Sequence, residues 1–133
     1  MPWTGLVGGD RPTARLAEFA PREAAAVDWI HRTFDRAVAE GSAGVVVMMQ
    51  AEPTTAKGYS KVRAAVTRRA AEFAKPVLLV HGDEHRYEAE PRYAGVPNLT
   101  RLETFGDTAT HWLKVTADST VPGVFSYAVR TVT

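Results

Sequence analysis

The sequence predicts an α/β fold in which a parallel strand–helix–strand core continues into antiparallel strands. Two short apolar runs, residues 45–49 and 77–80, flank a segment whose apolar side chains recur at helical spacing. The last third of the chain is instead rich in β-forming residues, interrupted by Gly, Pro and Asp at hairpin-like distances. A strand, a helix and a strand followed by strands alone indicate a parallel core with an antiparallel extension.

Length and composition limit the classes of protein that the chain can represent. The 133 residues, of which 45% are hydrophobic, suit a single domain spanning residues 1–133. The absence of cysteine excludes disulfides and thiolate metal sites. A formal charge of +1 argues against nucleic-acid binding, and no apolar run or start resembles a membrane span or a secretion signal. We therefore expect a cytoplasmic protein that acts on small substrates or binds protein partners.

The first helix is expected to begin at Pro21. The residues before it are rich in Gly and Pro and show no period, so they are predicted to form a loop with a short strand at residues 3–7. After Pro21, apolar residues recur at helical spacing, and Gly41 lies beyond the end of the pattern. The recurring residues are Val27, Ile30, Phe34 and Val38.

The apolar run at residues 45–49 is closed by Gln50 and predicts an interior, parallel strand that is covered on both faces. A second helix is expected over residues 59–73, with an apolar side and a basic side that faces solvent. Residues 77–80 form the next strand, and residues 99–106, 110–117 and 123–132 are predicted antiparallel strands. The alternating charges of residues 84–92 indicate a solvated loop between them.

The segment "HGDEH", residues 81–85, is the strongest candidate for a functional site. Ligands gather at the carboxyl ends of parallel strands, and both Gln50 and this segment follow such strands. If the strands are neighbours, Gln50, Asp83 and His85 can face one another. Amide, carboxylate and imidazole groups together suit a divalent cation. The same residues also suit an ordinary turn, because Gly and Asp favour turns and His is common at strand ends.

Two segments, "VVVMMQAEP" and "VLLVHGDEH", followed by antiparallel strands, resemble the C-terminal half of the calcineurin-like metallophosphoesterases. In that family one strand ends in a metal-binding His and a later strand ends in Gly-His-x-His. Here Gln50 occupies the first His position, Gly82 matches the Gly, Asp83 replaces the penultimate His and His85 matches the final His. The resemblance implies half of an αββα sandwich, with Asp83, His85 and Gln50 as ligands of Mn, Fe or Zn.

Two further residues would act beside a metal held at this segment. His81 would orient the site, and Arg86 would hold an anionic substrate, a phosphomonoester or a phosphodiester. The carboxylate motifs of the family's N-terminal half do not occur here, and a two-metal hydrolysis needs the ligands that they supply. No catalytic residue can therefore be assigned.

Two functions remain open: an incomplete phosphoesterase-like hydrolase, or a non-catalytic α/β module for assembly or partner binding. In both cases the apolar strands need more cover than two helices provide. We therefore expect a homo-oligomer, such as a symmetric dimer joined through the open sheet face or the Trp-bearing segments, or a protein that supplies the missing half.

Overall fold

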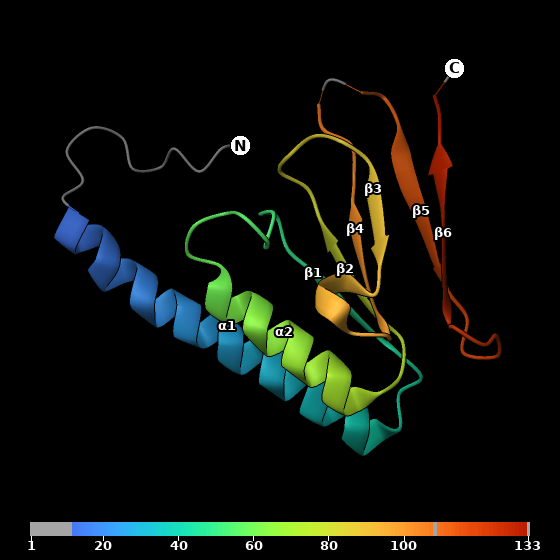
Figure 1. The fold of residues 1–133 in the computed structure, drawn as a ribbon, viewed down its shortest axis with the longest axis horizontal. Coiled ribbons are helices and arrows are strands. Elements are labelled where there is room, and N and C mark those ends of the chain that lie inside the picture. Colours follow the sequence, from blue (N-terminus) through green and yellow to red (C-terminus); the bar gives the residue numbers. More distant parts are fainter. Residues whose placement is uncertain (1–11, 108, 133) are drawn as a thin grey trace.

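A computed structural model of the chain describes residues 12–107 and 109–132 as helices packed on a sheet. In chain order the elements are α1 (Pro12–Glu40), β1 (Val45–Met48), α2 (Ser60–Phe73), β2 (Val77–His81), β3 (Glu88–Pro91), the 3-10 turn η1 (Tyr93–Gly95), β4 (Leu99–Glu103), β5 (Trp112–Ala117) and β6 (Phe125–Arg130). The helices lie side by side along one face of a four-stranded sheet, and the β5–β6 hairpin stands beside it (Figure 1). The predicted α/β class, with parallel and antiparallel strands, is confirmed.

The larger sheet has the strand order β1-β2-β4-β3, and one of its pairings differs from the prediction. β4 pairs in parallel with β2, so residues 99–103 belong to the parallel core and not to the antiparallel extension. The antiparallel partner of β4 is β3, which lies in the segment expected to be a loop. The loop prediction was wrong because Glu88 and Glu90 do not simply face solvent: they pair with a buried arginine on β4.

The first apolar run forms an edge strand, not the predicted interior strand. Val45 is buried, whereas Val46 and Met48, which point to the opposite face, are 39% and 77% exposed. The interior strands are β2 and β4, and in β2 Val77, Leu78 and Leu79 are all buried. An apolar run indicates that a strand tends to be buried. Whether that strand is flanked by other strands on both sides depends on the topology of the sheet.

Helix α1 begins at Pro12, nine residues earlier than predicted, and Pro21 lies inside it. Strong helix formers such as Ala, Arg, Leu and Glu dominate residues 14–20 and outweigh one proline. Pro21 has no N–H, so the carbonyl of Ala17 lacks its usual helical partner. The end of the helix is as predicted, with Gly41 in the left-handed region at φ 65°. The strand predicted at residues 3–7 lies outside the described residues.

Helix α2 agrees with the prediction to within one residue and packs against α1. The rings of Phe34 and Phe73 meet edge to face, with centroids 5.8 Å apart. Arg69 of α2 donates to the backbone oxygen of His31 and pairs with Asp35 at 2.6 Å, so the basic side of α2 is partly used within the chain. These contacts hold the two helices together as one layer.

The main core lies between this helical layer and the sheet. It contains Ile30, Phe34 and Ala37 of α1, Val62, Ala65, Val66, Ala70 and Phe73 of α2, and Val45, Val77, Leu79 and Leu99 of the strands, together with Tyr93. Each fully buried large side chain contributes roughly 1.5–3 kcal/mol relative to an exposed one. This layer supports the carboxyl ends of β1, β2 and β4, where the candidate site lies.

On the opposite face of the sheet, Leu78 and Leu102 are fully buried. The β5–β6 hairpin contacts the segment just before β1. The ring of Phe125 lies so close to Gly44 that a Cβ built on Gly44 would be 2.8 Å from the ring. Trp112 is nevertheless exposed, and so is Trp29 of α1, so neither of these tryptophans is a core anchor. The sheet face is thus covered in part, with the corner around Met48 left open.

Candidate functional site

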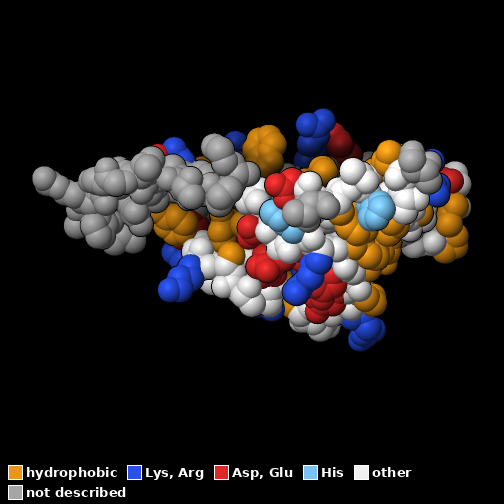
Figure 2. Space-filling view, turned by 90° about the horizontal axis from the view of Figure 1, so that it is seen from above, with side chains coloured by type: hydrophobic (Ala, Val, Ile, Leu, Met, Phe, Trp, Pro, Cys, Tyr) orange, Lys and Arg blue, Asp and Glu red, His pale blue; other side chains and the backbone are white. Residues whose placement is uncertain are grey.

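The carboxyl ends of β1 and β2 are adjacent, which is the condition on which the predicted site depends. Met48 is in register with Val80, and the backbone N–H of Gly82 donates to the backbone oxygen of Gln50 at 3.1 Å. Figure 2 looks down onto this end of the sheet and shows Asp and Glu side chains gathered around one His side chain, while a second His lies among hydrophobic side chains. The structure therefore brings the two predicted ligand segments to one edge.

The predicted ligands Gln50, Asp83 and His85 are all exposed at this edge. Oδ2 of Asp83 accepts the backbone N–H of Glu52 at 3.0 Å, and Nδ1 of His85 lies 3.5 Å from Oδ1 of Asp107. Among residues 12–107 and 109–132, no three His, Cys, Asp or Glu side chains are grouped closely enough to hold a metal ion. These residues alone therefore do not assemble the expected centre.

The turn that carries Asp83 and His85 has an unusual backbone. Asp83 has a φ of 89° and His85 a φ of 62°, in the left-handed region that non-glycine residues seldom adopt. The hydrogen bond from the backbone N–H of Glu52 to Asp83 ties this turn to the loop that follows β1. Strained residues of this kind concentrate at binding sites, where the surrounding structure maintains them.

His81 differs from the expected orienting residue, because it is the last residue of β2 and is buried in the sheet. Its Nδ1 is 2.7 Å from the backbone oxygen of Gly82, which can only accept, so Nδ1 carries the proton. Its Nε2 is 2.9 Å from Nη1 of Arg101, which can only donate, so Nε2 offers its lone pair. Both ring nitrogens are occupied, so His81 has no ring nitrogen left to orient a ligand.

Arg101, on β4, is the centre of a buried network that the sequence analysis did not detect. Its guanidinium donates to Glu90 at 2.8 Å and pairs with Glu88 at 2.9 Å. Burial acts to lower the pKa of Arg101, but the bond to Glu90 and the charges of Glu88, Glu90 and Glu52 raise it above its ordinary value. Arg101 therefore ties β2, β3 and β4 together near the candidate site.

Glu103 lies next to His81 in the register and is fully buried. Neither carboxylate oxygen has a hydrogen-bond partner among the described residues, and Nη1 of Arg101 is 3.6 Å from Oε1. Removing a carboxylate from water is costly unless it is paired and hydrogen-bonded. Glu103 is thus the least compensated charge in the network.

Glu52 follows β1 and is also buried, with 5% of its surface exposed. Its carboxylate accepts the backbone N–H groups of Thr54 and Thr55, both at 2.7 Å, and the hydroxyl of Thr55 at 2.6 Å. Burial opposes ionisation, but the bonds from Thr55 and Thr54 outweigh it and lower the pKa of Glu52 to about 2. Glu52 thereby shapes the loop whose backbone binds Asp83.

Arg86 was predicted to hold an anionic substrate. It lies on the surface and its Nε is 3.5 Å from Oε2 of Glu88. The pair is exposed, so solvent screens it and it contributes little to stability. Arg86 is accessible to solvent, but the carboxylate of Glu88 already lies beside its guanidinium group.

The sequence contained a signal for part of this network. Alternation along residues 99–103 places Leu99, Arg101 and Glu103 on one face, and Leu99 is a core residue. Because the arginine and the glutamate share a strand face with a core leucine, the pattern should have indicated a buried ion pair. Glu52 gave no comparable signal, because its burial depends on a loop without periodicity.

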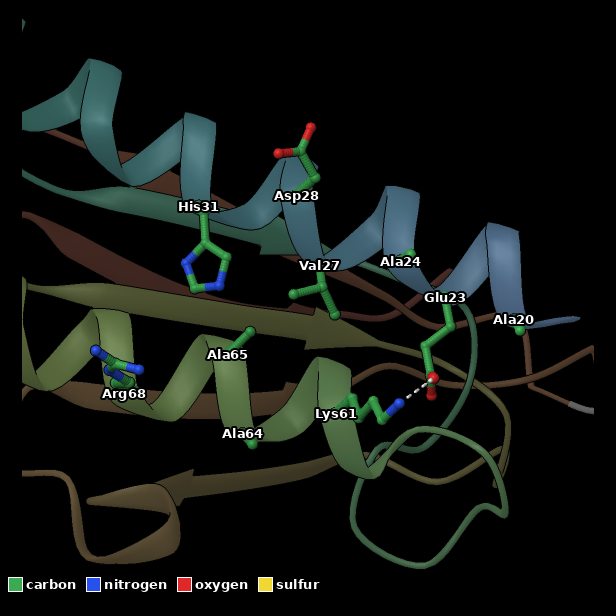
Figure 3. Close-up of a pocket in the computed structure, with 10 residues that line it drawn as sticks. All are labelled: Ala20, Glu23, Ala24, Val27, Asp28, His31, Lys61, Ala64, Ala65 and Arg68. Atoms are coloured by element: carbon green, nitrogen blue, oxygen red, sulfur yellow. Dashed lines mark ion pairs between the residues drawn. The ribbon is translucent and has the colours of Figure 1, made fainter.

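A separate hollow lies between α1 and α2 and has a volume of about 600 Å³ (Figure 3). Its floor is formed by small side chains, and Lys61 and Glu23 form an ion pair of 3.3 Å at one end. The other charged groups on its rim have partners on their own helices, Arg32 for Asp28 and Glu72 for Arg68. The hollow therefore lacks the convergent, uncommitted polar groups of a ligand site.

Comparisons with known proteins add no relationship to this picture. No protein-family model matches the chain, and neither the curated proteins nor the solved structures contain a match. Within the described part of the chain, no helix combines the length and apolar character needed to cross a membrane. Any functional assignment must therefore come from the residues themselves.

Proposed function

We propose that the chain is the second half of a metallophosphoesterase-like fold and contributes Asp83 and His85 to a divalent metal centre. Its remaining ligands would come from a partner subunit or from a further segment of polypeptide. The observation that supports this most is the strained turn at the carboxyl edge of the parallel sheet, which exposes both side chains. Gln50 faces the same turn through its backbone and would act as a weak ligand.

The chemistry of these groups suits such a centre. With Nδ1 of His85 facing Asp107, Nε2 is left for a metal, and Oδ1 of Asp83 is not used in the bond to Glu52. Carboxylate and imidazole ligands are compatible with Mn, Fe or Zn. A metal held here would polarise a phosphoryl oxygen and lower the pKa of bound water, which are the requirements of phosphoester hydrolysis.

The shortage of ligands sets the limit of the proposal for the isolated chain. A two-metal centre needs more donors than one carboxylate, one imidazole and one amide can supply. We therefore expect the isolated chain to bind one metal weakly and to hydrolyse phosphomonoesters or phosphodiesters only when the missing ligands are present.

The test is metal binding by the purified chain, measured by elemental mass spectrometry and by titration calorimetry with Zn²⁺ and Mn²⁺. Binding should be lost in His85→Ala and Asp83→Ala and kept in Glu84→Ala, an exposed neighbour in the same turn. Equal metal content in all four proteins, or none in any of them, would refute a metal centre at this turn. Turnover of an aryl phosphate would then be measured with the proteins that bind metal.

A second candidate function is a non-catalytic module for assembly, and the open edge of β1 favours it. Residues 41–51 carry no charge, and Val46 and Met48 are exposed beside backbone groups that no further strand pairs in the described residues. Natural edge strands are usually protected by charges, proline or bulges. A second copy or a protein supplying the missing half would cover this edge.

This alternative is tested by light scattering coupled to size-exclusion chromatography at tens of micromolar. Met48→Lys should dissociate a dimer formed through β1, whereas Thr116→Lys, a matched change on the exposed face of the hairpin, should not. A clean monomer for the unmodified chain would exclude self-association and leave a different protein as the partner.

A further inference from the structure

The carboxyl edge of the sheet concentrates negative charge, although the whole chain carries a formal charge of +1. Three segments in mutual contact form this acidic edge: residues 50–55, 81–90 and 101–107. They contain two guanidinium groups and seven carboxylates. The carboxylates belong to Glu52, Asp83, Glu84, Glu88, Glu90, Glu103 and Asp107, and Figure 2 shows acidic side chains gathered at this end of the molecule.

Glu103 is the buried part of this charge and lacks a hydrogen-bond partner among the described residues. Arg101 pairs with Glu88 at 2.9 Å and with Glu90 at 2.8 Å, but its Nη1 is 3.6 Å from Oε1 of Glu103. The Glu103 carboxylate is therefore directed at an arginine that is already shared. Because it is buried, its charge is screened less than a surface charge, so it adds to the negative potential of the acidic edge.

The exposed carboxylates are also uncommitted. Asp83 and Glu84 are exposed and take part in no ion pair of the described residues. The side chain of Asp107 is 85% exposed, and its neighbour is a histidine at 3.5 Å. These carboxylates are spread over open surface, which suits an extended segment with several organic cations, because each cation needs only one or two carboxylate oxygens and no closed shell of ligands.

An aromatic stack borders the acidic edge and distinguishes between the possible cations. The ring of Tyr87 stacks on Phe105 with centroids 5.7 Å apart, and Phe105 also meets His111 edge to face at 5.3 Å. Tyr87 is 36% exposed. A planar guanidinium group can lie over a tyrosine ring and bind a carboxylate with two parallel hydrogen bonds, whereas an ammonium group has no plane to stack. The acidic edge therefore fits arginine better than lysine.

We propose that the acidic edge is a docking surface for an arginine-bearing segment of a partner protein, whose guanidinium groups pair with the exposed carboxylates and stack on Tyr87. Complementary charge across such an interface accelerates association and selects the partner. The inference goes beyond the metal centre proposed above and does not require it, since the carboxylates and the aromatic stack are present in the metal-free chain.

Fluorescence anisotropy of dye-labelled hexa-arginine at low salt, with protein freed of metal by EDTA and then dialysed, tests the docking surface. The double variant Glu84→Gln with Asp107→Asn should bind roughly 3- to 10-fold more weakly than the unmodified protein. Glu40→Gln with Glu72→Gln, which removes two exposed carboxylates from the helices, is the matched control and should bind as the unmodified protein does. No binding to the unmodified protein, or equal weakening in both double variants, would overturn the proposal.

Two single variants test the aromatic stack and the buried charge. Tyr87→Leu should bind hexa-arginine about 2- to 5-fold more weakly. The unmodified protein should prefer hexa-arginine to hexa-lysine, and equal affinities for the two peptides would refute the role of Tyr87. Glu103→Gln keeps the shape of the side chain and should weaken binding at least about 2-fold. An unchanged affinity would refute the contribution of the buried charge.

Light scattering at low salt separates a different protein from a second copy of this chain as the occupant. Self-association that disappears in Glu84→Gln with Asp107→Asn would mean that another copy docks on the acidic edge, and it would overturn the assignment to a different protein. A metal-free protein that binds hexa-arginine but not Zn²⁺ would retain the docking surface and refute only the metal centre.

Discussion

Replacing Glu52 by Gln should reduce stability in a way that depends on pH. The carboxylate accepts three hydrogen bonds from Thr54 and Thr55, which only the ionised form can fully satisfy. The pKa of Glu52 falls from 4.5 to about 2 in the folded protein, which corresponds to about 3 kcal/mol of stability. This contribution is complete above pH 4.5 and is lost as the pH falls from there toward 2.

Urea unfolding of the unmodified protein and of Glu52→Gln, measured between about pH 7 and pH 3, tests this reasoning. The unmodified protein should be more stable by about 3 kcal/mol at neutral pH, and the difference should shrink as the carboxyl takes up a proton. Glu40→Gln, which breaks an exposed pair with Arg36, should leave the stability almost unchanged, because solvent screens that pair. Parallel pH profiles for the Glu52 variant and the unmodified protein would refute the assignment.

Three further predictions concern packing and the buried network, each measured by urea unfolding. Leu79→Ala, at a fully buried position of β2, should cost about 2–5 kcal/mol, and a cost below about 1 kcal/mol would contradict the described core. Arg101→Met should cost about 3–5 kcal/mol by leaving the buried carboxylate of Glu103 without its nearest cation, whereas Glu103→Leu should be neutral or stabilising. The reverse order of these two effects would mean that the Glu103 carboxylate has a partner. Gly44→Ala should cost about 1–3 kcal/mol, because its Cβ would lie 2.8 Å from the ring of Phe125, and an unchanged stability would show that the hairpin does not pack there.

The sequence was most informative where burial follows a simple period. Residues 60–73 and 77–81 form the helix and strand that their patterns predicted, because one side of α2 and both faces of β2 are covered in the fold. The period of apolar side chains depends only on the chain itself, so no tertiary information was needed to detect it.

The sequence was least informative where two charges compensate each other. Glu88 and Glu90 were assigned to a solvated loop, but Arg101 brings them into a strand at the sheet edge. Reading charges one segment at a time cannot identify a partner that lies eleven residues further along the chain. For the same reason Asp107 was not associated with His85 before the structure placed them together.

The amino-acid sequence by itself determined the helices, the strands with an apolar or alternating pattern and the segment that carries Asp83 and His85, because hydrophobic period and local turn chemistry are properties of neighbouring residues. The tertiary structure decided that β1 lies at the edge, that β4 joins the parallel core and that His81 is enclosed by Arg101. The tertiary structure also decided the ion pairs, such as those of Arg101 with Glu88 and Glu90. These outcomes depend on contacts between residues far apart in the chain, and the free energy of such contacts is set by burial and by partners that no single segment contains.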